Sequence, residues 1–143
     1  MTSSVLCAVD VSQDHDKKVL ETANKLAQLD NAQLDVMTVI PSAGITLVAS
    51  YFDENFQGEL VAETQKKLVD KVASVLGEDR NSEIRHVVAT GSIYEEILEG
   101  AKKAGSDLIV IGAHQPHLSE YLLGPNAARV VRHSKCSVYV VRD

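Results

Sequence analysis

Short apolar runs, each long enough for one β-strand, alternate along the chain with stretches of helical periodicity. Such alternation is typical of βαβ units, in which parallel strands share a sheet and helices pack on its faces. We therefore expect an α/β fold with a doubly wound open sheet of five mainly parallel strands and helices on both faces. The expected strands are residues 5–9, 34–40, 84–89, 108–111 and 137–141, and the expected helices are residues 14–28, 60–76, 93–104 and one from Gly124–Pro125.

Two of the predicted strands, residues 5–9 and 108–111, are apolar at every position. A strand of this kind is buried on both sides, so these two are expected at the centre of the sheet. If they are neighbours, the direction of the chain across the sheet reverses between them, and their carboxyl ends frame a ligand crevice. Those ends carry Asp10 and Gly112.

Length and charge exclude several classes of protein. The chain has 143 residues, which suits one domain over residues 1–143. With 20 acidic and 14 basic residues, the net charge of −6 disfavours a nucleic acid as partner. No apolar stretch has membrane length and no signal peptide is evident, so we expect a cytoplasmic protein. Cys7 and Cys136 lack metal-ligand spacing, and Cys7 is expected to be a buried, inert thiol.

The segment from residue 112 to residue 126 joins a central strand to a helix. Free N–H groups at the start of that helix would point into the crevice and could bind phosphate. Gly112 would let a ligand approach the backbone, whereas a plain connecting loop explains the same glycines. We expect His114 or His117 to contact phosphate or solvent, and no metal site. Asp10 could accept hydrogen bonds from ribose, or could cap the following helix, as could Ser12 or Asp14.

Landmarks along the whole chain resemble the universal stress protein family. They are Val9-Asp10-Val11-Ser12, Val39, Gly91-Ser92-Ile93, the segment 112–126, and the final Ser137-Val138-Tyr139-Val140-Val141. The segment 112–126 is most similar to the F- and G-like members, with Leu-Leu-Gly-x-Asn in this place.

The resemblance implies a Rossmann-like sheet of the adenine nucleotide α-hydrolase type, with strand order 3-2-1-4-5. It also implies that the crevice binds ATP, or ADP or AMP, with Mg²⁺. Asp10 then matches the ribose position and Val39 the position whose backbone reads adenine. Gln115 and Pro125 depart from the family's glycine-rich signature. The residues expected to bind nucleotide are Ala8, Val9, Asp10, Val39, Gly112, His114, Gln115, His117, Ser119, Gly124, Pro125, Asn126 and Ala127.

The family resemblance implies a regulatory stress-response protein in which ATP orders residues 115–123. Relatives hydrolyse ATP or phosphorylate themselves slowly, but we expect no turnover enzyme. The last strand is apolar on both faces, and the resemblance implies a homodimer, or a higher oligomer, through Ser137, Val138, Tyr139, Val140 and Val141. The protein partner that such a regulator would act on is unknown.

Other functions compete with this interpretation. The chain has neither GxGxxG after its first strand nor GxxxxGK[ST], which excludes classical dinucleotide and P-loop sites. A nucleotide-independent dimeric interaction protein with a decayed ATP loop stays open. A receiver-like signalling domain is a weaker alternative, because the third strand ends in Ala89-Thr90-Gly91 without a carboxylate.

Overall fold

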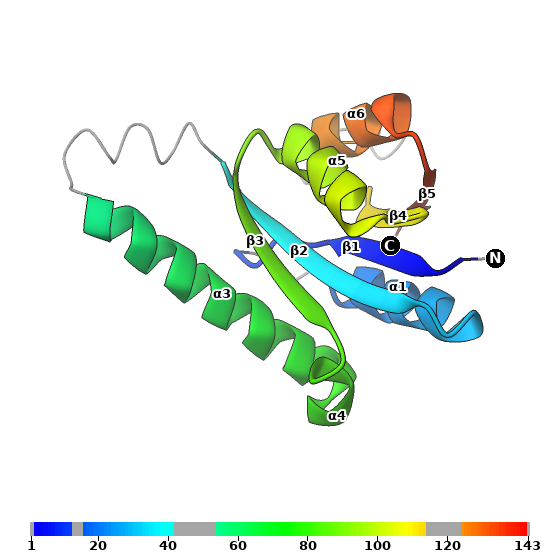
Figure 1. The fold of residues 1–143 in the computed structure, drawn as a ribbon, viewed down its shortest axis with the longest axis horizontal. Helices are drawn as coiled ribbons and strands as arrows, with labels where there is room; N and C mark the ends of the chain where they lie inside the picture. Colours follow the sequence, from blue (N-terminus) through cyan, green and yellow to red (C-terminus); the bar gives the residue numbers. More distant parts are fainter. Residues whose placement is uncertain (1, 13–15, 42–53, 114–123, 143) are drawn as a thin grey trace.

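The computed structural model describes residues 2–12, 16–41, 54–113 and 124–142. Five strands form one sheet in the order β3-β2-β1-β4-β5, and every neighbouring pair is parallel (Figure 1). This confirms the predicted fold class and strand order. The strands are β1 (Ser4–Ala8), β2 (Gln33–Pro41), β3 (Arg85–Gly91), β4 (Leu108–Gly112) and β5 (Ser137–Val141).

Helices cover both faces of the sheet. Figure 1 shows α5 and α6 on one face and α1 and α3 on the other. None of the helices in the described part of the chain combines the length and apolar character needed to cross a membrane. The helices are α1 (Lys17–Leu29), α3 (Glu54–Leu76), α4 (Glu78–Asn81), α5 (Ile93–Ala104) and α6 (Pro125–His133).

The carboxyl end of α5 follows from local chemistry. Gly105 adopts a left-handed conformation with φ of 66° and closes α5, as its position predicts. Ser92 occupies the N-cap position of α5, but its hydroxyl makes no capping hydrogen bond. Two expectations were wrong: α1 begins at Lys17 rather than residue 14, and α3 begins at Glu54 rather than near residue 60. Gly58 lies inside α3, which shows that one glycine does not end a long helix.

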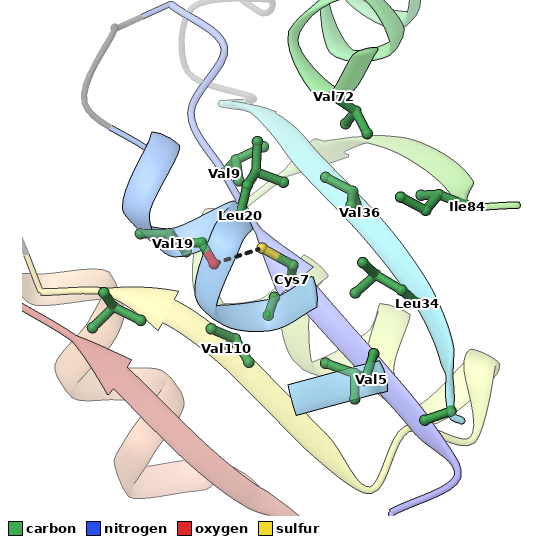
Figure 2. Packing of buried hydrophobic residues seen from close by; sticks show 14 of the residues in the cluster. Val5, Cys7, Val9, Val19, Leu20, Leu34, Val36, Val72, Ile84 and Val110 are labelled. Atoms are coloured by element: carbon green, nitrogen blue, oxygen red, sulfur yellow. Dashed lines mark hydrogen bonds between the residues drawn. The ribbon is translucent and has the colours of Figure 1, made fainter. Parts of the chain in front are cut away.

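The core between the sheet and helices α1 and α3 is continuous and apolar (Figure 2). Val5 and Cys7 of β1 pack there against Leu20 of α1 and Val72 of α3, and all four are fully buried. The Cys7 thiol lies 3.9 Å from the Val19 carbonyl oxygen, to which it donates. Burial raises the pKa of Cys7 far above its ordinary value, and the negative charge of Asp16 adds to the effect. The predicted burial of this thiol is confirmed.

The opposite core lies under α5 and α6 and contains Leu6, Met37, Ile97 and Val130. Here α5 approaches the sheet closely because Gly100 has no side chain. A Cβ atom at Gly100 would lie 2.8 Å from the Met37 sulfur, which is too close without a shift of that side chain. Gly100 therefore determines how near α5 lies to β1 and β2.

Val131 does not face inward as its spacing predicts. Ala127 and Val130 are buried, but 44% of Val131 is exposed. The reason is topological: β5 is the edge strand, and no further strand or helix in the described part of the chain covers the outer side of α6.

Candidate functional site

The carboxyl edge of the sheet contains a topological switch point between β1 and β4. From β1 the chain continues through α1 to β2 on one side, and from β3 it continues through α5 to β4 on the other side. β1 lies between β2 and β4 and pairs with both. The order of the strands therefore proceeds in opposite directions on the two sides of β1. In open α/β sheets ligands bind in the crevice outside the strand ends at this point. As predicted, Asp10 follows β1 and Gly112 is the last residue of β4.

Asp10 lies at the end of β1 with an exposed side chain. One carboxylate oxygen, Oδ1, accepts the backbone N–H of Ser12 at 2.9 Å and the Ser12 hydroxyl at 2.6 Å. This local turn orients the side chain. No described residue donates to the other oxygen, Oδ2, so it is free to accept a hydrogen bond from a ligand. Asp10 does not cap α1, because the N-cap position belongs to Asp16.

Asp16 and Lys71 are charged residues of the crevice that the sequence analysis did not assign to it. Asp16 is buried, and its Oδ2 accepts the N–H of Asp10 at 2.5 Å. Lys71 of α3 donates from Nζ to the Asp10 carbonyl oxygen at 3.3 Å. A helical period can show that Lys71 is near the solvent side of α3, but only the packed fold shows that it reaches the end of β1.

Val39 occupies a place where β2 extends beyond β1. The ladder between these strands ends at the pair Ala8–Met37, and the Val9 N–H donates to the Met37 carbonyl oxygen at 2.9 Å. Backbone groups of a strand point to the same neighbour every second residue, so those of Val39 point toward β1 as those of Met37 do. No described residue of β1 pairs with Val39. Its backbone N–H and C=O thus face the crevice and can bind the edge of a planar ring.

Gly112 has a packing role in the structure. A Cβ atom there would lie 3.1 Å from Cγ2 of Val19 and 3.8 Å from Oδ1 of Asp16. The missing side chain therefore lets the start of α1 approach β4 closely. This close packing is enough to explain why a glycine occupies position 112, without any ligand. Gly112 and Asp16 nevertheless lie at the crevice.

The start of α6 supplies the anion-binding feature. Gly124 is the buried N-cap residue, and Pro125 is the first helical residue, as predicted. Pro125 has no N–H, but the N–H groups of Asn126 and Ala127 belong to the first turn, where a helix has no internal partner for them. Two backbone donors at the positive end of a helix dipole can bind a phosphate.

The remaining predicted site residues divide into two groups. Ala8 is half-buried and Val9 is buried, so these two can contribute backbone and packing at the floor of the crevice. Among the described residues, no three His, Cys, Asp or Glu side chains lie close enough together to hold a metal ion. His114, Gln115, His117 and Ser119 lie outside the described residues.

The strand order argues against a receiver-like domain. That fold has the order 2-1-3-4-5, in which the third strand lies beside the first. Here β3 lies at the edge, beyond β2, and ends at Gly91. An acceptor carboxylate at the end of β3 would therefore be a whole strand away from Asp10.

Fold and site together define an α/β protein with a ligand crevice at a switch point and a helix N-terminus beside it. The chain belongs to the universal stress protein family, whose family model matches residues 1–142. It is 33% identical to universal stress protein G of Escherichia coli O157:H7 over 99% of this chain and 100% of that protein. The Shigella flexneri protein of the same name has the same identity and coverage.

Solved structures support the same fold. The universal stress protein UspA of Lactobacillus plantarum has a TM-score of 0.68 and 24% identity, covering 98% of this chain and 97% of that chain. A universal stress protein in complex with cAMP has a TM-score of 0.63 at 21% identity, covering 99% and 97%. The Archaeoglobus fulgidus protein in complex with dAMP has a TM-score of 0.62 at 20% identity, covering 96% of each chain.

Proposed function

We propose that this protein binds an adenine nucleotide, either ATP, ADP or AMP, in the crevice between β1 and β4, and acts as a regulatory module in the stress response. The observation that carries the proposal is the arrangement of three ligand-facing features at one switch point. They are the Val39 backbone, the Asp10 carboxylate and the first turn of α6.

Each feature fits one part of an adenine nucleotide. The N–H and C=O of Val39 complement the hydrogen-bonding edge of adenine. Asp10 Oδ2 accepts from a ribose hydroxyl while Oδ1 keeps its contacts with Ser12. The N–H groups of Asn126 and Ala127 suit a phosphate. Complexes of family members with cAMP and dAMP show that related proteins bind adenine nucleotides.

The charge of the crevice bears on how many phosphates it accepts. Asp10 and the buried Asp16 place negative charge beside the strand ends, and Lys71 offsets part of it. A triphosphate adds further negative charge, so we expect it to enter with Mg²⁺ bound to its own oxygens. Mg²⁺ should therefore strengthen the binding of ATP much more than that of AMP.

The proposal extends to assembly and location. We propose a homodimer formed through β5, whose outer edge pairs with no other strand among the described residues. A nucleotide at the N-terminus of α6 would act on the helix that leads directly into β5. This connection would let nucleotide binding change the dimer or its surface for a partner protein. The free cysteines and acidic composition suit the cytoplasm.

The first experiment identifies the small molecules released from the purified, denatured protein by mass spectrometry and then titrates the emptied protein with ATP and Mg²⁺ by calorimetry. The informative variant is Asp10→Asn, because the amide keeps an oxygen for Ser12 but replaces Oδ2 by a donor. We expect the dissociation constant of ATP to rise about tenfold, the value of one hydrogen bond to a charged group.

The matched control is Ser12→Ala, which removes the hydroxyl contact with Asp10 and leaves the carboxylate in place. Its affinity for ATP should stay close to that of the parent protein. A second variant, Gly124→Val, should weaken binding by crowding the start of α6. A purified protein that carries no nucleotide and gives no heat with ATP, ADP or AMP would contradict the proposal. The nucleotide-independent dimeric interaction protein would then be the better interpretation.

A further inference from the structure

A groove of about 420 Å³ lies between α5 and α6, at the amino end of β4. This is the opposite edge of the sheet from the nucleotide crevice, since it is lined by residues that precede β4 and β5. Leu98, Ala101 and Cys136 give the groove an apolar surface. Its volume falls within the range of small-molecule sites, roughly 300 to 1,000 Å³.

Two lysines line the groove. Ser106 and Lys135 each lie two residues before Leu108 and Ser137, the first pair of the β4–β5 ladder, and so at the amino end of these strands. The end of α5 reaches the same corner, because the Ser106 N–H donates to the Ala101 carbonyl oxygen and the Gly105 N–H to that of Lys102. Lys102, Ser106 and Lys135 all line the groove. Among the described residues, neither lysine has an ion pair.

The hydroxyl of Ser106 is buried at this basic corner without a hydrogen-bond partner among the described residues. A buried unsatisfied hydroxyl is costly and calls for an explanation. A carboxylate seated between the two lysines would accept a hydrogen bond from this hydroxyl. One other described hydroxyl, that of Ser4, is buried without a partner, but Ser4 does not line the groove.

Two glutamates of α5 also line the groove and limit which other charged groups a ligand can have. Glu99 and Glu95 lie one and two turns of α5 before Lys102, and both are exposed. Their negative charge disfavours a second anionic group near them, whereas their carbon stems can lie along an apolar chain. The groove therefore suits a molecule with one anionic head and an apolar tail.

We propose that this groove binds the anion of a medium-chain fatty acid. Its carboxylate accepts hydrogen bonds from Lys102, Lys135 and the Ser106 hydroxyl. Its chain lies over Leu98, Ala101 and Cys136. The proposal does not depend on nucleotide binding, because the two sites are at opposite edges of the sheet.

The test is a calorimetric titration of the full chain with sodium decanoate below its micelle concentration. Lys102→Ala combined with Lys135→Ala should weaken binding by about a hundredfold, because two charged hydrogen bonds are lost. Ser106→Ala should weaken it about threefold to tenfold. Ser4→Ala is the matched control, since it removes the other unpartnered hydroxyl, and it should leave the affinity unchanged. Urea unfolding of each variant verifies that the fold is intact.

The position of the tail is tested through the Cys136 thiol. Cys7 is fully buried, so iodoacetamide should modify Cys136 first in the folded protein. Saturating decanoate should slow this alkylation at least about tenfold, and decyltrimethylammonium, which has the same chain and opposite charge, should not. Equal binding of the two amphiphiles would overturn the proposal and indicate nonspecific adsorption. An unchanged alkylation rate in saturating decanoate would also overturn it.

Discussion

The two edge strands of the sheet, β3 and β5, each pair with one neighbour, yet their side chains protect the open edge very differently. Near the start of β3, Arg85 reaches the buried Asp35 of β2 with hydrogen bonds of 2.7 and 2.9 Å. Next to it, His86 Nε2 lies 2.6 Å from Asn81 Oδ1 of α4. Charged and hydrogen-bonded side chains of this kind discourage the pairing of a further strand.

The β5 edge has no such protection. Between Ser137 and Val141 there is no charged residue. Tyr139 of β5 is 46% exposed, and Val131 on the adjoining α6 is 44% exposed. An apolar edge strand with exposed apolar neighbours suits a partner strand, whereas β3 suits solvent. This contrast supports the proposed dimer through β5.

The largest effect is expected from breaking the ion pair that secures β3. Arg85→Leu leaves the Asp35 carboxylate buried beside β1 without its partner. Removing one member of a buried pair costs about 3–5 kcal/mol, and we expect about 2–3 kcal/mol here because the Arg85 side chain is 60% exposed. The measurement is the free energy of unfolding in urea.

The control for this variant is the double substitution Asp35→Leu with Arg85→Leu. An apolar pair needs no charge compensation, so the double variant should recover most of the lost stability. If Arg85→Leu unfolds at the same urea concentration as the parent chain, the ion pair does not stabilise the β3 edge.

A lysine placed on each edge in turn tests which one forms the dimer. Tyr139→Lys introduces a charge on β5 that would meet its own copy across a two-fold axis. We expect the dimer to dissociate at least about tenfold more readily, roughly 1.4 kcal/mol, while the monomer stays folded. Analytical ultracentrifugation over a concentration series measures the effect.

Val87→Lys is the matched substitution on β3, where the native side chain is 36% exposed. It should leave both the assembly state and the stability within about 0.5 kcal/mol of the parent values. A dimer that dissociates with Val87→Lys and persists with Tyr139→Lys would assign the interface to β3 instead.

Much of the fold could be predicted because its signals are local. Continuous apolar runs identified β1 and β4 as central strands, and glycine and proline positions identified the carboxyl end of α5 and the start of α6. The same runs placed Asp10 and Gly112 at the crevice.

What could not be predicted depends on contacts between distant segments. Asp35 interrupts an apolar strand, and nothing near it in the sequence indicates that Arg85 neutralises it. In the sequence Gly100 is one more helical glycine, and only the packed fold shows that Met37 lies against it. The buried position of Asp16 at the crevice likewise requires the neighbouring strands. Each of these features arises from packing across the sheet, which periodicity along one element does not contain.

The smallest expected effect is a pH dependence confined to the β3 edge. Burial lowers the pKa of His86 from its ordinary value of 6.5, so the unfolded chain takes up this proton at a higher pH than the folded protein does. The stability contributed at this position is therefore complete above the ordinary pKa and declines as the pH falls through it.

His86→Gln can keep a donor to Asn81 but does not titrate, so the loss of unfolding free energy between about pH 7.5 and about pH 5.5 should be smaller than in the parent chain. Because β5 contains no histidine or carboxylate, the same substitution should leave the dimer's dependence on pH unchanged. An equal loss of stability in both proteins would show that His86 is not the group that makes this edge sensitive to acid.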